Sequence, residues 1–468
     1  MPVLTKDTCY PGLFNTKFNM VNLDLKAINE KVENGTAPFK KLIRCNMGNP
    51  NSVGQKEVEF VRQLIAGTIY PELLEKNIFP ADVIERCREI LNSCIGKNTG
   101  SYQQTEGVQI IREHVAEYIS TRDSSPCSAD SVFLCNGATD GIMNILRPII
   151  RGDQDAILCP KPGFPLYNAT ATYFGGHEIS YELDEENDWA VDEKLLEEAI
   201  KKTDKTVRCL VVINPNNPVG AVQTIQNLKN MLKFASKHNL LVIADEVYQH
   251  NIYSNIPFIS CRKCLKELEA QNQCKGLELI SINSASKSMY GECGRRGAYW
   301  QTENIDKEVL TQLLDIISLG AINTDGMIAM DAIVKPPKAG EPSYEVWKRE
   351  YQSILDSLTK KAHMVATEMN SWEGISCRTP TGAMYVFPRI HASANAISAA
   401  KAAGKSADEL YCQDLLEEVG VICLPGNVFG QKAGTYHLRM TILPDEDEML
   451  ELMQRWRVFH LNWMKKYQ

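Results

Sequence analysis

The stretch VRCLVVINPNNPVG, residues 207–220, joins a mostly apolar run to a turn rich in asparagine and proline. Its first half, Val207–Ile213, is dense in β-branched and other apolar residues, which is typical of a strand buried on both faces of a sheet. Polar residues follow at once, and open α/β sheets bind ligands beyond the carboxyl ends of their strands. The stretch therefore predicts an α/β fold with a site where this strand ends.

Similar runs lie on both sides of this stretch and alternate with helical patterns, for example at Asp192–Lys202 and Thr224–His238. Such alternation favours a mostly parallel sheet between helices, here with seven strands. The six further strands are expected at Ser131–Cys135, Asp155–Leu158, His177–Tyr181, Leu240–Ala244, Leu277–Asn283 and Gly297–Trp300. A helix is expected at Asp140–Ile150.

The two ends of the chain differ from this core. A proline-containing helical segment, Asn49–Leu91, precedes it, and a long helix at Ser343–Asn370 follows it. Short strands at Ala383–Phe387 and His437–Thr441 flank an alanine-rich stretch, Ala392–Ala407, which reads as an exposed insertion or the approach to a helix. We expect a smaller α+β domain built from both chain ends. We expect residues 1–95 to form an N-terminal arm and part of the small domain. Residues 96–330 are expected to form the large domain, and residues 331–468 the C-terminal rest of the small domain.

The composition, 44% hydrophobic and 23% charged, is that of a globular protein. A formal net charge of −8 argues against a dedicated nucleic-acid binder. No apolar run reaches the roughly 18 residues that a membrane helix needs. The start, Met1–Asp7, lacks the basic and then apolar regions of a secretory signal. We therefore expect a cytoplasmic protein with no nucleic-acid or membrane partner.

The 15 cysteines are scattered along a chain too long to need disulfides, and we expect thiols in a reducing compartment. Cys261 and Cys264 have the two-residue gap of metal or redox sites. A zinc site needs four converging ligands, usually from two such pairs, and only one pair is present. We expect a structural role for this pair and no metal site.

Two turns could present groups to a ligand. Asn136–Gly141 lies between a strand and a helix, where small residues let backbone amides approach an anion such as phosphate. A plain strand-to-helix turn explains the same residues equally well. Asn214–Gly220 contains two Asn-Pro steps, which suggest a rigid turn, with a cis bond at Pro218, that presents an amide side chain.

Two strand ends carry ionisable groups. Asp245 ends a buried strand, where a carboxylate is costly without a partner such as a protonated ring nitrogen, and Tyr248 could donate to an oxygen of the same ring. Lys287, in Ser284–Lys287 after the next strand, could be a Schiff-base nucleophile. The pair Arg295 and Arg296 follows and could hold a phosphate.

In this order the four segments resemble the fold type I aminotransferases, which use pyridoxal 5′-phosphate (PLP). The resemblance extends from about Leu42 to His460, and the joint match is specific although each segment alone is not. It implies an α/β fold type I transferase that moves an amino group from an amino acid to a 2-oxo acid. Within the family, Arg44–Pro50, Lys287–Gly297 and Pro336–Tyr344 are most similar to members that transfer the amino group of L-alanine to 2-oxoglutarate.

The resemblance implies a role for each matching residue. Lys287 bonds covalently to the cofactor, Asp245 keeps its pyridine nitrogen protonated, and these two act in catalysis with Tyr248. The other implied contacts are Asn217 and Tyr248 at the ring hydroxyl, Ala138, Thr139, Ser284 and Arg296 at the phosphate, Phe164 on the ring face, Arg439, Gly48 and Asn217 at the substrate, and Tyr102 at the phosphate of a neighbouring subunit. The role of Tyr102 implies a homodimer with shared active sites.

Some residues depart from the family pattern. Arg295 stands where relatives usually carry Tyr, so either arginine could meet the phosphate; we favour Arg296 for its spacing to Gly297. Ala321–Gly326 differs from the Pro-rich form near the site, which leaves amino-acid preference open. Cys293 is expected to pack and His437 to be structural.

Three alternative functions remain open. The first is a transaminase of glutamate:glyoxylate or aspartate specificity. The second is a lyase of the same fold. The third is a non-catalytic regulator that binds the cofactor, although no added DNA-binding segment is evident.

Overall fold

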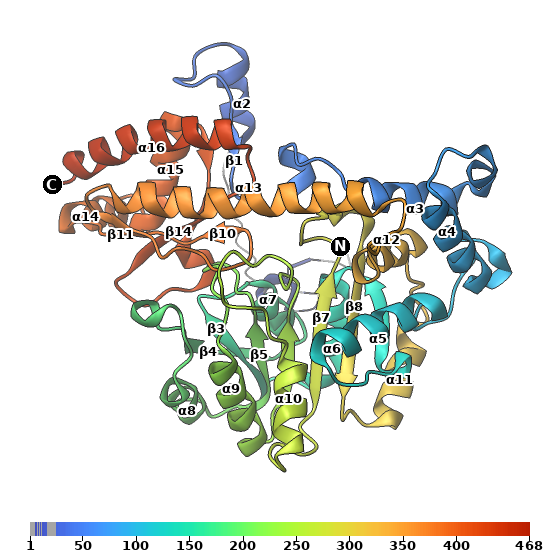
Figure 1. The fold of residues 1–468 in the computed structure, drawn as a ribbon. Helices are drawn as coiled ribbons and strands as arrows, with labels where there is room; N and C mark the ends of the chain where they lie inside the picture. The colour runs from blue at the N-terminus through green and yellow to red at the C-terminus, as the bar shows by residue number, and fades with distance from the viewer. Residues whose placement is uncertain (1–4, 7, 9, 11, 16–24) are drawn as a thin grey trace.

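The computed structural model describes residues 5, 6, 8, 10, 12–15 and 25–468. Cys9 and most of Met1–Asp7, where we predict no secretory signal, lie outside the described residues. Figure 1 shows a central sheet with helices around it and a second, C-terminal part above, with the long helix α13 (Tyr344–Asn370) running across the molecule at their junction.

The central sheet has seven strands in the order β2-β8-β7-β6-β5-β3-β4. All are parallel except β8, which is antiparallel to both of its neighbours. The strands are β2 (Val132–Asn136), β3 (Asp155–Lys161), β4 (His177–Glu182), β5 (Thr206–Ile213), β6 (Leu241–Asp245), β7 (Leu279–Ser284) and β8 (Gly297–Glu303). The α/β fold with a mostly parallel sheet is thus confirmed, as is the cis bond at Pro218.

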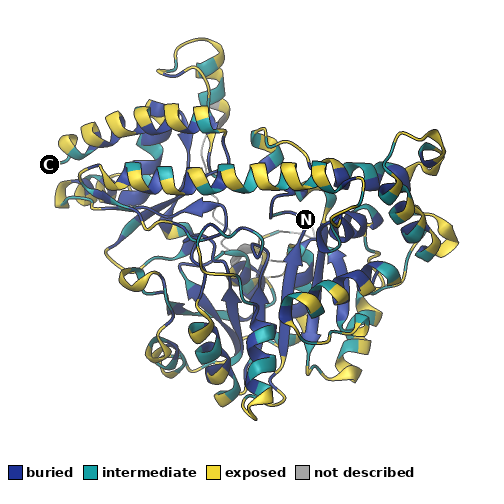
Figure 2. Cartoon of the chain, in the orientation of Figure 1, coloured by how far each residue is buried: buried dark blue, intermediate teal, exposed yellow. Residues whose placement is uncertain are grey.

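The position of β5 between two hydrophobic cores explains why its sequence is so apolar. Val211 and Ile213 belong to the hydrophobic core on one face of the sheet, and Leu210 and Val212 to the core on the other. Successive side chains of a strand point to opposite faces, so both faces need apolar residues. Figure 2 shows the same burial along the neighbouring strands, while the covering helices expose one side.

Helices cover both faces of the sheet, and their caps explain two of the predicted starts. Asp192 and Thr224 accept hydrogen bonds from backbone N–H groups in the first turns of the two helices expected after them. The helices around the sheet are α5 (Gln109–Asp123), α6 (Ala138–Ile149), α7 (Leu166–Tyr173), α8 (Glu193–Lys201), α9 (Ile225–Lys237), α10 (Cys261–Ala270), α11 (Lys307–Ile317) and α12 (Thr324–Val334).

The second part contains a small antiparallel sheet in the order β10-β14-β11-β9, with β13 also paired to β14. A parallel pair joins β1 (Ile43–Arg44) to β12 (Val421–Ile422), which places a segment from near the start of the chain beside its end. The other elements are β9 (Ile375–Ser376), β10 (Tyr385–Val386), β11 (Arg389–Ile390), β13 (Leu424–Pro425), β14 (Tyr436–Thr441), α14 (Ala394–Ala402), α15 (Ala407–Val419) and α16 (Glu446–Lys466). The domain boundaries at 95 and 330 stay a prediction.

The remaining helices precede the central sheet in the sequence. They are α1 (Gly12–Asn15), α2 (Leu25–Glu33), α3 (Glu59–Ile69) and α4 (Ala81–Ser93), of which the last two occupy the proline-containing segment predicted to be helical. Short 3-10 turns are η1 (Pro50–Val53), η2 (Pro71–Lys76), η3 (Ile95–Lys97), η4 (Ala129–Ser131), η5 (Glu185–Asn187), η6 (Cys293–Arg295) and η7 (Gly426–Phe429). Among the helices of the described residues, none is long and apolar enough to cross a membrane.

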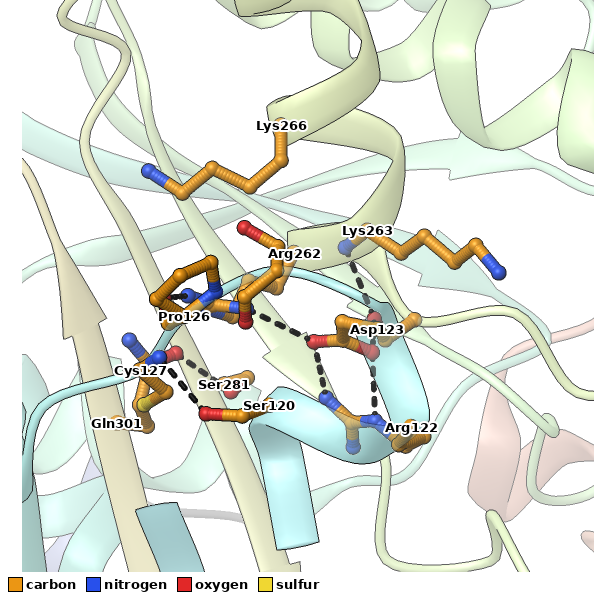
Figure 3. Close-up of polar contacts among 12 residues, drawn as sticks. Ser120, Arg122, Asp123, Pro126, Cys127, Arg262, Lys263, Lys266, Ser281 and Gln301 are labelled. Carbon is orange, nitrogen blue, oxygen red and sulfur yellow. Dashed lines mark hydrogen bonds and ion pairs between the residues drawn. The ribbon is translucent and has the colours of Figure 1, made fainter. Parts of the chain in front are cut away.

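A buried ion cluster joins α5 to α10 (Figure 3). Asp123 accepts hydrogen bonds from Arg122 at 2.7 and 2.9 Å, from Ser260 at 2.7 Å and from Arg262 at 3.3 Å. Arg262 also pairs with Glu303 of β8 at 2.6 Å. Although burial opposes it, the hydrogen bond from Arg122 and the neighbouring charges lower the pKa of Asp123. The cluster therefore ties two helices and an inner strand together with matched charges.

We expect Asp123→Asn to lower the free energy of unfolding by about 3 kcal/mol, because it leaves buried guanidinium groups without their shared carboxylate. The measurement is the midpoint of thermal unfolding at fixed pH. Arg88→Ala is the matched control, since Arg88 pairs with Glu75 on the exposed surface, where such pairs contribute at most about 1 kcal/mol. Equal shifts in the two variants would contradict the prediction.

Candidate active site

A cavity of about 350 Å³ opens at the carboxyl ends of β5, β6 and β7, between the central sheet and the C-terminal part. Every site residue predicted from the sequence lines it except Tyr102. Those residues are Gly48, Ala138, Thr139, Phe164, Asn217, Asp245, Tyr248, Ser284, Lys287, Arg296 and Arg439. The parallel sheet gathers most of them because successive strands end at the same edge. Gly48, which follows β1, and Arg439, on β14, come from outside this sheet.

Lys287 follows the end of β7 and lies in a turn held by its neighbours. The backbone N–H of Ser286 donates to Ser284 Oγ at 2.9 Å, and that of Ala285 donates to the Gly297 carbonyl at 2.9 Å. The Lys287 Nζ donates to the Gly48 carbonyl at 2.7 Å. Within the described residues no carboxylate forms an ion pair with this amine, so only a neutral oxygen holds it at the cavity wall.

Asp245 lies at the end of β6, at the cavity floor. It accepts a hydrogen bond from the Tyr167 hydroxyl at 3.0 Å and one from the Val247 N–H at 3.4 Å. Burial raises the pKa of Asp245 to about 6, although these hydrogen bonds and the charge of Lys287 oppose the rise. In the described part of the chain no basic side chain pairs with it. A buried carboxylate in this state suits a ligand that brings a protonated nitrogen.

The turn before α6 forms the other end of the cavity. Gly137 has a φ of 86°, and a Cβ there would lie 2.3 Å from the Arg296 guanidinium, which therefore crosses the turn. Arg296 donates to the carbonyls of Cys293 at 3.1 Å and Asn136 at 3.4 Å. These neutral partners leave its charge available to an anion. Arg295 does not line the cavity and lies 3.7 Å from Glu292 instead.

Arg439 of β14 reaches the cavity from the C-terminal part. It donates to Asn217 Oδ1 at 3.0 Å and to the Asn46 carbonyl, and its guanidinium lies 4.4 Å from the Tyr385 ring centre. Burial lowers the pKa of this arginine, and its buried Nε has no hydrogen-bond partner. No carboxylate among the described residues pairs with it. A buried cation of this kind fits the carboxylate of a ligand.

Two tyrosines, one lining the cavity and one bonded to Asp245, were not predicted from the sequence. The Tyr385 hydroxyl lies 3.0 Å from that of Tyr248, whose pKa is raised by burial and by this neighbour. A Cβ at Gly48 would lie 2.2 Å from the same hydroxyl, so the glycine makes room for it. Tyr167 was also missed as the partner of Asp245. The partners of both tyrosines are distant in the sequence, so no local pattern marks these contacts.

Cys293 lines the cavity, whereas Tyr102 lies outside it. Cys293, expected to pack, also lines the cavity, and its Sγ donates to the Ser286 carbonyl at 2.9 Å; burial raises the pKa of this thiol. Tyr102 is 83% exposed and lies outside the cavity, in a surface hollow that it shares with Leu319, which is 89% exposed. Cys261 and Cys264 are buried on α10, and no metal-binding group of three or more side chains is present in the described residues.

The sequence matches known proteins over most of its length. The sequence model of the family described as aminotransferase class I and II matches residues 71–455. Alanine aminotransferase 2 of Xenopus laevis is 38% identical over 99% of this chain and 88% of its own length. Glutamate–glyoxylate aminotransferase 1 of Arabidopsis thaliana is 40% identical over 92% of this chain and 90% of its own length.

The fold also matches solved structures. The structure of alanine aminotransferase from Pyrococcus furiosus superposes with a TM-score of 0.77 and covers 97% of this chain and 100% of its own, at 22% identity. A structure titled as an aminotransferase from Escherichia coli gives a TM-score of 0.75 over 97% of this chain and 98% of its own. At this level of identity the likeness concerns the fold alone.

Proposed function

Because the chain belongs to the class I and II aminotransferase family, we propose that it transfers the amino group of L-alanine to 2-oxoglutarate, giving pyruvate and L-glutamate. The chain is a PLP-dependent transaminase, and its cavity fits that cofactor. One observation carries the proposal: the Lys287 amine, the buried Asp245 carboxylate and Arg439, which has no anionic partner among the described residues, line the same cavity. The X. laevis relative supports alanine as donor.

The cofactor would be held from end to end by the residues of the cavity. Lys287 would bind it covalently, Asp245 would meet its ring nitrogen, and Arg296 would meet its phosphate. The other contacts we propose are Ala138, Thr139 and Ser284 at the phosphate, Asn217 and Tyr248 at the ring hydroxyl, and Phe164 on the ring face. When bound, PLP would supply an electron sink for the pair left at the substrate Cα, which makes removal of the Cα proton feasible.

The side chains of this chain then bind, orient and move protons. Arg439 pairs with the substrate carboxylate, with Gly48 and Asn217 beside it, and so fixes the direction of the Cα–H bond. The Lys287 amine, once free, would take the proton from Cα as general base and, as the conjugate acid, would deliver it to the C4′ carbon of the cofactor. Asp245 keeps a proton at the ring nitrogen, because its buried carboxylate and the protonated, positively charged nitrogen stabilise each other.

The glycine at the phosphate turn supplies a test of this placement. We expect Gly137→Ala to weaken PLP binding to the apoenzyme by about tenfold or more, because its Cβ would displace Arg296 and strain a left-handed backbone. The measurement is a titration of PLP followed by absorbance. Gly294→Ala is the control, since a Cβ there meets nothing within 4 Å. Unchanged affinity in Gly137→Ala would place the phosphate elsewhere.

We also propose a homodimer with shared sites, in which Tyr102 reaches the phosphate held by the partner. The support is the exposure of Tyr102 and Leu319, which line one surface hollow, and of Ile316 and Val309 on α11. We expect Leu319→Asp to raise the dimer dissociation constant at least about tenfold, because a charge would be buried in the contact. Sedimentation measures it, with Val458→Asp as the control, at a residue of α16 that is 62% exposed. A dimer unaffected by Leu319→Asp would overturn this interface.

A cytoplasmic location is part of the proposal. Its support is that the cysteines of the described residues are all free thiols, which suits a reducing compartment. A relative in Dictyostelium discoideum, 38% identical, is named a probable mitochondrial alanine aminotransferase. Cell fractionation distinguishes the two compartments, and recovery with mitochondria would overturn the cytoplasmic assignment.

The test of the function is a coupled assay of the PLP-loaded protein. Pyruvate is followed from L-alanine and 2-oxoglutarate, with L-glutamate plus glyoxylate and L-aspartate plus 2-oxoglutarate run beside it. Pyruvate that forms only with the 2-oxo acid supports the proposal. Faster turnover of glutamate with glyoxylate would favour the second candidate, which the A. thaliana relative supports. Ammonia release without a 2-oxo acid would indicate a lyase.

A further inference from the structure

Tyr385, on β10, presents its hydroxyl and its ring face to two different residues of the cavity. The hydroxyl lies 3.0 Å from the Tyr248 hydroxyl, and the two rings meet edge-on with their centres 5.8 Å apart. The ring face lies against Arg439, whose guanidinium is 4.4 Å from the ring centre. Tyr385 is 2% exposed, so both contacts are buried. One side chain therefore connects the residue that we place at the ring hydroxyl of PLP with the residue that we place at the substrate carboxylate.

The main chain beside the cavity leaves room for the Tyr385 hydroxyl. A Cβ at Gly48 would lie 2.2 Å from the hydroxyl oxygen and 3.1 Å from the ring carbon that carries it. A larger residue at position 48 would therefore displace the oxygen from its place beside Tyr248. The main chain of Tyr385 is fixed from the other side, because this residue pairs with Thr441 of β14. The hydroxyl is thus held in contact with Tyr248 by both of its surroundings.

The number of hydrogens available decides which tyrosine donates. The two hydroxyls share one hydrogen bond, and either of them can donate it. A tyrosine hydroxyl has one hydrogen to give and can also accept. Within the described residues neither hydroxyl has another hydrogen-bond partner. Once the Tyr248 hydrogen is directed at the ring oxygen of PLP, the hydrogen between the two tyrosines has to come from Tyr385.

This arrangement strengthens the bond from Tyr248 to the cofactor. A hydroxyl that accepts a hydrogen bond becomes a better donor, because hydrogen bonds in a chain polarise one another, by about 10–30% per bond. Burial raises the pKa of Tyr248 well above its ordinary value, so this hydroxyl keeps its hydrogen at neutral pH. Tyr248 therefore has the hydrogen that a donor needs, and Tyr385 has the position from which to direct it.

We propose that Tyr385 is a positioning residue, whose hydroxyl donates to Tyr248 and so directs the Tyr248 hydrogen at the ring hydroxyl oxygen of PLP, while its ring face supports Arg439. The inference rests on the proposed function, in which Tyr248 meets that ring oxygen and Arg439 meets the substrate carboxylate. The two contacts use different parts of one side chain, so substitutions can separate them. Phenylalanine removes the hydroxyl and keeps the ring, whereas leucine removes both.

The first test is the pH at which the absorbance of PLP bound to the enzyme changes, measured without substrate. The negative charge of the ring oxygen holds the proton whose loss changes the absorbance, and a donor to that oxygen stabilises part of the charge. A weaker donor leaves the proton more firmly held and moves the midpoint to higher pH. We expect Tyr248→Phe to raise the midpoint by about 1.5 pH units and Tyr385→Phe by about 0.5, since the second change only weakens the bond that the first removes.

A control and a double variant show whether Tyr385 acts through Tyr248. Tyr181→Phe removes another buried hydroxyl, which donates to the Val211 carbonyl at 2.9 Å outside the cavity, and should leave the midpoint unchanged. In the double variant Tyr248→Phe/Tyr385→Phe, loss of the Tyr385 hydroxyl should add nothing to the effect of Tyr248→Phe.

The outcomes separate this inference from the proposed function. A midpoint that is unchanged or lowered in Tyr385→Phe, or one that rises equally with and without the Tyr248 hydroxyl, overturns the inference alone. If Tyr248→Phe itself leaves the midpoint unchanged, the placement of PLP in the proposed function is wrong, and the inference fails with it.

The second test addresses the ring face through the dissociation constant of propanoate, measured by calorimetry with the PLP-loaded enzyme. Propanoate has a carboxylate but no amine, so it binds without reacting. Tyr385→Phe should bind it as the wild type does, because the ring against Arg439 remains. Tyr385→Leu should bind it about fivefold more weakly, the scale of one cation–π contact. Equal affinities in the two variants, whether strong or weak, would overturn the division of roles between the hydroxyl and the ring.

Discussion

Lys287→Ala should lower the rate of transamination by about 10⁴-fold, because it removes the amine that we assign as both covalent anchor and general base. No other amine lines the cavity among the described residues, so no neighbour can take its place. The measurement is the single-turnover rate with L-alanine in PLP-loaded protein. Binding of PLP should persist in weakened form, since the phosphate and ring contacts of the cavity remain.

The control for this variant is Lys401→Ala, which removes an exposed lysine from α14 and should leave the rate unchanged. Absorbance of the bound cofactor verifies that the Lys287 variant still carries PLP, so that a slow rate is not mistaken for an empty site. A rate within tenfold of the wild type would remove Lys287 from its assigned role, and with it the mechanism proposed for this cavity.

Arg439→Leu should lower kcat/KM for L-alanine by about 10³-fold, equivalent to ~4 kcal/mol, because the substrate carboxylate would enter a buried pocket without its charge partner. Most of the change should come from KM, since the lost contact exists before and during reaction. Steady-state kinetics over a wide range of alanine concentrations measure it. The neighbouring Asn217 and Asn46 oxygens would then face the incoming carboxylate, which adds to the loss.

Two controls isolate the carboxylate contact. Arg457→Leu changes an exposed arginine on α16 and should leave kcat/KM unchanged. A primary amine that lacks a carboxylate should react equally slowly with the wild type and with Arg439→Leu, because Arg439 offers it nothing. A similar loss for both substrates would mean that the substitution distorts the cavity as a whole and would contradict the assignment.

The central sheet could be predicted because burial on both faces leaves a strong mark on the sequence. Val207–Ile213 is apolar at successive positions, as its two cores require. Lys287 and Asp245 were placed together for a related reason: parallel strands end at one edge, and polar residues that follow buried strands gather there. These features follow from local pattern and one rule of topology.

What could not be predicted depends on partners far away in the sequence. Asp123 reads as an ordinary surface acid at the end of a helix, and only the fold brings Arg262 and Ser260 to it. Tyr385 reads as a core aromatic until β10 places its hydroxyl beside that of Tyr248. Helices α15 and α16 were also missed, and they pack against each other across a long stretch of sequence.

The bond between Arg439 and the Asn46 carbonyl spans 393 residues of sequence. Proteins are synthesised from the N-terminus, and early segments fold as they leave the ribosome. The central sheet has all its strands once β8 has emerged, whereas Asn46 must wait for β14. A nascent chain therefore acquires its sheet well before the corner of the cavity that recognises a carboxylate, and that corner closes only in the last stage of synthesis.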